Sequence, residues 1–216
     1  MNLTSTGQQE GSGLPAGKQK LIDAALRLAA RDGITLSSLG LRELAREAGL
    51  NHNTFYRHFR RADELGQAAA EEVAAQLMSG MKEIRRRAAR RADATLGVVE
   101  YFIDFVLGSP DVFIVGAREL HSIASPMRAV LLCVLEDIAR ESVDQISAQD
   151  LAPLIPRELL FYVSLDITNY LFAHSLDVID RPQNRKQLTA QFVAHIRRQF
   201  LGAMPIQQAR DRKPRP

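Results

Sequence analysis

The 216-residue chain has a single cysteine and no tryptophan. One cysteine cannot form a disulfide within the chain, so cross-links of that kind are excluded. This residue, Cys133, stands in the apolar run AVLLCVLEDI, where we expect a small buried hydrophobe; a reactive thiol is the alternative. No apolar run approaches the ~18 residues of a membrane span, and the N-terminus lacks the apolar segment of a signal peptide. We therefore expect a cytoplasmic protein that makes no membrane contact.

Alternating runs of apolar and polar residues bounded by turns are also missing, which argues against a sheet. The apolar residues, 46% of the chain, recur instead at helical spacing. The predicted fold class is therefore all-α, with about nine helices. The expected helices cover 18–32, 41–48, 52–59, 62–91, 94–107, 111–117, 126–146, 156–179 and 182–202.

Sites of enzyme chemistry are absent as well. The chain has no nucleophile elbow, no phosphate-binding glycine loop and no paired catalytic carboxylates. His174 and Asp177 have helical spacing, but two ligands without a third do not make a metal site. We expect no enzyme activity, no cofactor and no metal.

The net charge of the chain is only +3, which by itself does not indicate a nucleic-acid partner. Its placement is more informative. The run RRRAARR at 85–91 closes the long predicted helix and is either a solvated face or a contact to a nucleic-acid backbone. The C-terminal segment PIQQARDRKPRP is a basic tail with the same two interpretations, and the polar start of the chain is a disordered tail.

The segment LRELAREAGLNHNTFYRHFRRADEL, at 41–65, predicts two short helices joined by a tight turn. Gly49 permits the positive φ of such a turn, and Asn51 is a favoured first cap of the second helix. This is helix-turn-helix geometry, in which the second helix enters the DNA major groove. Burial of Phe55 and Phe59 turns donor-rich side chains outward, although an ordinary helical hairpin with a polar face has the same spacing. The candidate DNA contacts are Arg42, Asn51, His52, Asn53, Thr54, Tyr56, Arg57 and His58.

The C-terminal half carries apolar stripes that form a core, and some of their residues must line any ligand pocket between helices. Polar residues within these stripes need a partner, which is another side chain or a ligand head group. The candidate ligand-binding residues are Phe102, Phe105, Val106, Phe113, Arg118, His121, Asn169 and His174.

We expect four segments along the chain: a disordered tail at 1–16, a helix-turn-helix domain at 17–63, a ligand-binding and dimerisation domain at 64–204, and a basic tail at 205–216.

The segment AREAGLNHNTFYRHFRRADEL resembles the N-terminal domain of the TetR family of one-component transcriptional regulators. The likeness lies in the Gly-Leu turn, the TFYRHF segment of the recognition helix and the acidic-Leu start of the next helix. That segment and SPDVFIVGARELHS further resemble the branch that represses unsaturated fatty acid synthesis and senses long-chain acyl-CoA. The chain departs from the family pattern at two positions. Gly40 stands where the family usually has a capping Ser or Thr, and we expect Ser38 to substitute for it. Ala62 stands where many members have a phosphate-contacting Lys, and we expect Arg60 and Arg61 to replace it.

The resemblance implies a homodimeric repressor that binds a palindromic double-stranded DNA operator and responds to a small hydrophobic effector, with acyl-CoA the first candidate. It also implies that Arg118 holds the polar end of that effector. The last two long helices would form the dimer interface through Leu160, Val163, Ile167, Phe192 and Ile196. Two alternatives stay open: a regulator of efflux or catabolic genes with another effector, and a helical lipid carrier or enzyme.

Overall fold

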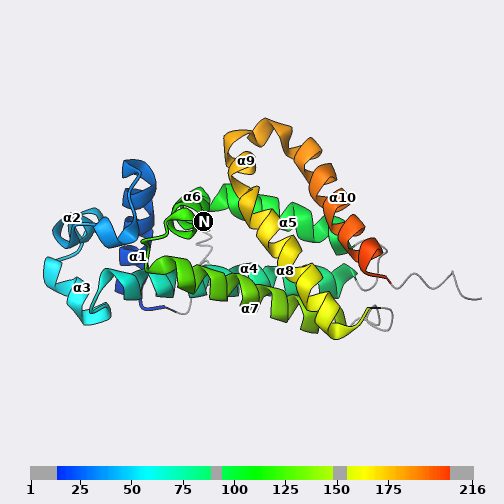
Figure 1. Ribbon diagram of the computed structural model, residues 1–216. Coiled ribbons are helices and arrows are strands. Elements are labelled where there is room, and N and C mark those ends of the chain that lie inside the picture. Colours follow the sequence, from blue (N-terminus) through cyan, green and yellow to red (C-terminus); the bar gives the residue numbers. More distant parts are fainter. Residues whose placement is uncertain (1–13, 89–93, 148–154, 205–216) are drawn as a thin grey trace, which may run out of the picture.

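The computed structural model describes residues 14–88, 94–147 and 155–204, and it is helical with no strand in those residues (Figure 1). The predicted all-α class is confirmed. The predicted tail at 205–216, residues 1–13 of the predicted tail at 1–16, and Arg90 and Arg91 lie outside the described residues. The end of the N-terminal tail was wrong by one residue, because α1 already begins at Ala16. The helices are α1 (Ala16–Asp32), α2 (Leu41–Glu47), α3 (His52–His58), α4 (Ala62–Ala88), α5 (Ala94–Gly108), α6 (Pro110–His121), α7 (Met127–Ser147), α8 (Arg157–Ala173), α9 (Ser175–Asp180) and α10 (Arg185–Ala203), with the short 3-10 turns η1 (Leu36–Ser38) and η3 (Pro182–Asn184).

Two predicted helices are wrong in extent. The helix expected at 111–117 continues to His121 as α6. The helix expected over 156–179 is divided at His174 into α8 and α9. At the division the Ser175 hydroxyl donates to the Phe172 carbonyl at 2.7 Å, and a serine that bonds the preceding turn in this way competes with the regular helical ladder.

The helices α1, α2 and α3 form a small bundle at one end of the molecule (Figure 1). Phe55 of α3 is its fully buried centre, surrounded by Leu21, Leu28 and Leu44. Leu65 and other residues of early α4 belong to the same core. α4 therefore runs as one continuous helix from the small bundle into the rest of the chain.

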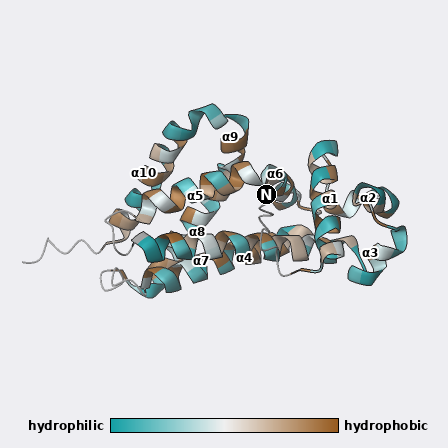
Figure 2. Ribbon diagram, turned by 180° about the vertical axis from the view of Figure 1, so that it is seen from behind, coloured by the Kyte–Doolittle hydropathy of each residue, from teal (hydrophilic) through white to brown (hydrophobic). Residues whose placement is uncertain are grey.

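α5 and α7 pack along α4, and α8 and α10 pack on these two helices in turn. α5, α7, α8 and α10 surround a second apolar core that includes Val99, Phe102, Ile103 and Phe192. The helices carry both polar and apolar residues (Figure 2), as helices that bury one side do. None of the helices in the described residues is long and apolar enough to cross a membrane.

Cys133 is not the buried hydrophobe that its apolar neighbours suggested. Its side chain is exposed on α7, because α7 turns Leu135, Ile138 and Ala139 inward and leaves this position on the outer face.

Two tight turns of the small bundle need glycine. Gly33 has φ 69° and caps α1, with the Ile34 N–H donating to the Ala29 carbonyl at 3.2 Å. Gly49 has φ 65° in the turn between α2 and α3. Both positions were predicted, since an L side chain is strained in this left-handed region.

Gly49→Ala should therefore lower the free energy of unfolding by about 1 kcal/mol. The reason is backbone strain alone, because an added Cβ at Gly49 meets no atom within 4 Å. Gly202→Ala is the matched control: it also has open space and lies in α10, so the free energy should hold or rise by up to about 1 kcal/mol. Chemical denaturation, monitored by the helical circular dichroism signal, measures the free energy of unfolding of both variants. Equal changes in the two variants would contradict the role of positive φ at Gly49.

Candidate functional site

The first candidate site is the outer face of α3. The helix begins at Asn51, whose side-chain oxygen accepts a hydrogen bond from the Asn53 N–H at 2.9 Å. Phe55 points into the small core and packs on Phe59 with ring centroids 5.8 Å apart. Since these anchors fix the rotation of α3 about its axis, the opposite side faces solvent.

The predicted DNA contacts do not all lie on that face. Asn51, Asn53, Tyr56 and Arg57 are exposed, as is Arg42 near the start of α2. Tyr56 is 56% exposed for so large a ring, and it packs edge-on against His52 at 5.6 Å. The side chains that remain half-buried are His52, Thr54 and His58.

His58 in particular lies against α1. Its Nε2 is 2.7 Å from the point that a Cβ on Gly17 would occupy, so the absence of a side chain at Gly17 makes room for the ring. The start of α2 also differs from expectation. Ser38 does not substitute for the missing cap at Gly40, because its hydroxyl bonds that of Thr35 at 2.9 Å.

The second candidate site is a cavity of about 520 Å³ in the middle of the larger bundle. Its walls come from α4, α5, α6, α7, α8 and α10, and most of the lining is apolar. Representative lining residues are Leu77, Met81, Phe102, Phe113, Leu171 and Phe172. A cavity of this size and character falls within the range of small-molecule sites, roughly 300–1,000 Å³.

Several polar residues interrupt this apolar lining, among them Arg85 and Ser164, and Arg197 of α10. Arg85 of α4 lines the cavity and donates from its guanidinium to the side-chain oxygen of Gln145. Burial lowers the pKa of Arg85 to about 10, an effect that the nearby Glu141 partly opposes. On α8, the Ser164 hydroxyl is buried in the cavity wall and has no hydrogen-bond partner among the described residues. A buried polar atom without a partner is unfavourable, so a ligand group there would satisfy it. Arg85 has N–H donors beyond the one that bonds Gln145.

Only part of the predicted ligand set lines this cavity. Phe102 and Phe113 do. Phe105 and Val106 pack in the surrounding core instead, and His174 pairs with Asp177 at 2.8 Å while its ring lies 4.3 Å from that of Tyr170. A separate groove of about 500 Å³ on the surface of α6, α8 and α9 is lined by Arg118, His121 and Asn169.

Sequence reasoning missed Arg85 and Ser164. A signal for Arg85 was present, because Leu77, Met81 and Arg85 follow one another at i, i+4 and i+8 on the inward side of α4. Arg85 was grouped instead with the basic run at 85–91, which was read as a solvated face or a DNA contact.

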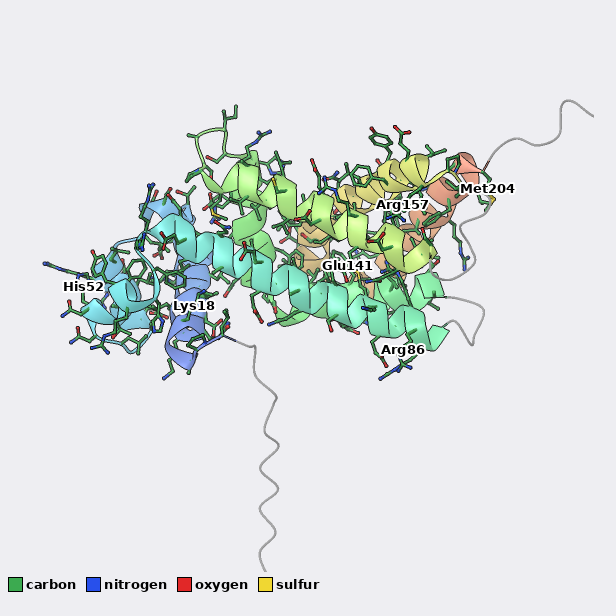
Figure 3. All side chains as sticks on the ribbon, turned by 90° about the horizontal axis from the view of Figure 1, so that it is seen from below. Lys18, His52, Arg86, Glu141, Arg157 and Met204 are labelled. Atoms are coloured by element: carbon green, nitrogen blue, oxygen red, sulfur yellow. The ribbon has the colours of Figure 1, made fainter. Side chains whose placement is uncertain are left out.

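The described part of that run lies at the end of α4 remote from α3, as the labels of His52 and Arg86 show in Figure 3. A DNA contact by α3 and one by this run would therefore fall at opposite ends of the chain. Arg86 and Arg87 pair with Glu83, and their hydrogen bonds hold the pKa of that carboxyl at about 2.

A third feature lies where the two bundles meet. A small cavity of about 80 Å³ is bordered by Leu36 of η1, Gly66 of α4, Glu119 of α6 and Met127 of α7. Glu119 is 1% exposed, and both of its carboxyl oxygens accept hydrogen bonds. One comes from the Leu36 N–H at 2.6 Å and the other from the Ser125 hydroxyl.

The neighbouring Arg118 makes a second connection between the bundles. Its guanidinium donates to the carbonyls of Ala29 at 2.8 Å and Ile34 at 3.1 Å, at the C-terminal end of α1. A cation at a helix C-terminus is favourable. Arg118 therefore caps α1 and also lines the separate groove, and its expected role at an effector's polar end stays a prediction. The arginines that line the central cavity are Arg85 and Arg197.

The residues predicted to face a partner subunit are also corrected. Leu160, Val163, Phe192 and Ile196 are buried within their own chain, and Ile167 lines the cavity. The apolar side chains that α8 and α10 expose are different ones. They are Leu159 (40% exposed), Tyr162 (58%) and Leu201 (66%).

Comparison with known proteins agrees with this architecture. Residues 21–69 match the sequence profile of the family described as bacterial regulatory proteins, tetR family. Among solved structures, a transcriptional regulator of the TerR/AcrR family from Aquifex aeolicus is 17% identical with a TM-score of 0.63, over 84% of this chain and 98% of that one. The fatty acid degradation regulator FadR from Bacillus halodurans is 15% identical with a TM-score of 0.62, over 94% and 100%.

A third similar structure is the TetR family repressor AlkX from a Dietzia species, implicated in the biodegradation of n-alkanes. It is 16% identical with a TM-score of 0.54, over 86% of this chain and 98% of that one. Regulators of this family are transcription factors and not enzymes, in agreement with the expectation from sequence. Residues 21–69 therefore match the tetR family of bacterial regulatory proteins, and the described chain has the fold of solved regulators of this kind.

Proposed function

We propose that this chain is a ligand-responsive repressor that binds a palindromic operator as a homodimer and controls genes of lipid metabolism. One observation supports the proposal that the chain binds DNA. The segment that matches the family, 21–69, contains α3, whose exposed face displays Asn53, Tyr56 and Arg57. Asn can read adenine, and Tyr and Arg can hold phosphates, so these are suitable groups for a major-groove helix.

A dimer is needed because one short helix reads only a few base pairs, and a two-fold pair reads both halves of a palindrome. The exposed apolar side chains of α8 and α10, Leu159, Tyr162 and Leu201, are the surface that we assign to the partner subunit. This surface replaces the buried residues that the sequence suggested for the dimer interface, and it lies on the same two helices.

The effector we propose is a long-chain acyl compound, with acyl-CoA as the form that the sequence resemblance implies. The central cavity supports a chain-like ligand, because it is apolar and about 520 Å³ in volume. Two of the similar structures belong to regulators connected by name with fatty acids or n-alkanes. The alternative is a hydrophobic drug or catabolite, which the same apolar cavity would accept.

The connection between cavity and DNA is α6. Phe113 of this helix lines the central cavity, and the same helix carries Arg118 and Glu119 to α1 and η1. A ligand that displaces α6 therefore changes the position of the N-terminal helices. The ligand shifts the population between two arrangements to the extent that it binds one of them better.

The experiment that tests the function is a titration of the protein into labelled DNA from upstream of its own gene, at fixed salt. A scrambled fragment is the control, and palmitoyl-CoA or oleoyl-CoA is then added. Specific binding that a thioester changes supports the whole proposal. Specific binding that no thioester changes leaves the repressor and removes the lipid, while lipid binding without specific DNA binding favours a carrier.

Tyr56→Phe removes one hydroxyl from the exposed face of α3. If that hydroxyl donates to a phosphate, operator affinity should fall for all sequences alike, because phosphate contacts carry no sequence information. Asn53→Ala should instead relax the preference at one base pair, by about 1–3 kcal/mol for a bidentate contact. Binding to an operator library by fluorescence anisotropy separates these patterns, and an unchanged affinity for Tyr56→Phe would contradict its role.

Glu119→Ala leaves the Leu36 N–H buried without an acceptor. We expect the free energy of unfolding to fall by about 1–3 kcal/mol. We also expect the effect of ligand on operator affinity to shrink more than ligand binding itself, because the connection through α6 is broken. Glu71→Ala is the matched control, since Glu71 is an exposed helical glutamate bonded only to Gln67 in the described residues. Equal ligand responses in the two variants would contradict this coupling.

A further inference from the structure

The two internal cavities lie end to end along α4. The α4 residues of the small cavity run from Gly66 to Leu77, and those of the central cavity run from Leu77 to Arg85. The distance from Gly66 to Arg85 along the helix is about 28 Å at the rise of an α-helix. The two cavities together therefore follow α4, the long helix seen in Figure 1, from the remote end of the bundle to the junction with the N-terminal helices.

Five side chains line both cavities and separate them: Leu77, Leu135, Ile138 and the two aromatic ones, Phe113 and Phe172. Phe113 of α6 and Phe172 of α8 line both of them, and their ring centroids are 6.1 Å apart. Phe172 approaches α6 closely because Gly116 has no side chain: a Cβ there would be 3.1 Å from the Phe172 ring. Side chains that rotate, and not backbone, thus form this partition.

The two ends of this path differ in charge. Arg85 lies at the remote end, where its one hydrogen bond to a protein side chain among the described residues goes to the neutral oxygen of Gln145. The nearest carboxylate that acts on it, Glu141, accepts a hydrogen bond from the Gln145 amide nitrogen. A guanidinium has five N–H donors, so this bond leaves capacity for an anion. Glu119 lies at the other end, with both oxygens accepting hydrogen bonds. An anion is therefore favoured at Arg85 and disfavoured beside Glu119.

We propose that the two cavities hold one amphipathic molecule, a single alkyl chain with an anionic head, placed with its head at Arg85 and its chain end past the Phe113–Phe172 pair in the small cavity. Only a chain long enough to reach the small cavity disturbs the contact between Glu119 and Leu36, so chain length decides whether bound ligand changes DNA binding. This inference rests on the proposed function and assigns it a ligand orientation and a length requirement. A free carboxylate and an acyl-CoA thioester share the required chemistry.

The hydrophobic effect gives the length dependence a magnitude. Each further methylene that moves from water into apolar space strengthens binding by about fourfold. A small apolar cavity stays dry, so a chain end that enters it displaces no well-bound water. Chains that stop short of the Phe113–Phe172 pair occupy the central cavity without touching the walls of the small one.

The first experiment measures binding of octanoate, dodecanoate and hexadecanoate to the full chain by calorimetry, with methyl hexadecanoate and palmitoyl-CoA alongside. The account predicts that affinity rises with chain length, that the neutral ester binds at least about tenfold more weakly than the acid, and that only long chains change operator binding. Octanoate that binds and changes operator binding as hexadecanoate does would overturn the length requirement. The acid and the thioester compared at equal chain length identify the natural source of the head group.

The second experiment uses two pairs of variants on α4. Ala70→Leu fills the small cavity, which Ala70 lines, while Ala75→Leu adds the same side chain at an exposed position. We expect Ala70→Leu to weaken hexadecanoate binding by at least about tenfold and to leave octanoate binding unchanged. Retained octanoate binding also shows that the variant has folded. Equal hexadecanoate affinity in the two variants would overturn the placement of the chain end.

Arg85→Gln and Arg87→Gln form the second pair, since Arg87 is an exposed arginine in the same turn that pairs with Glu83. Arg85→Gln should reduce the difference in affinity between hexadecanoate and its methyl ester, and Arg87→Gln should keep it. A difference that persists in Arg85→Gln would overturn the placement of the head. If no DNA is bound specifically, the proposed function fails, and these binding data still decide where the ligand lies.

Discussion

The hydrogen bond from the Leu36 N–H to Glu119 joins the two halves of this molecule. Glu119 is buried where α6 meets η1, and the preceding residue, Arg118, caps the C-terminal end of α1. Two adjacent side chains of one helix thus fix the position of the N-terminal helices on the larger bundle. Because a buried N–H without its acceptor is unfavourable, a displacement of α6 that weakens this bond also affects the DNA-binding helices.

Groups that stabilise the fold poorly surround the cavity. Arg85 is a largely desolvated cation whose hydrogen bond goes to a neutral amide, and the Ser164 hydroxyl has no partner in the described part of the chain. An apolar space of about 520 Å³ also forgoes the packing that a filled core would provide. Proteins break such rules mainly at functional sites, which agrees with a bundle whose central helices are arranged around a ligand.

Much of the fold could be predicted from local signals. The turns at Gly33 and Gly49 and the cap at Asn51 follow from the conformations that these residues adopt. Arg118 could not be placed in this way, because its partner Ala29 is 89 residues away in the chain. The predicted dimer-interface residues were wrong for another reason. Because α8 is apolar on more than one side, periodicity alone cannot separate Leu160, which faces the core, from Tyr162, which faces solvent.

Hydrogen exchange of the Leu36 amide tests the link between cavity and DNA-binding helices most directly. The measurement compares the free protein with the protein saturated by hexadecanoate or palmitoyl-CoA, using amides of the α4 core as the internal reference. Faster exchange at Leu36 on ligand binding, with the reference amides unchanged, is the predicted result. Unchanged protection at Leu36 under conditions where the same ligand alters operator affinity would contradict the account.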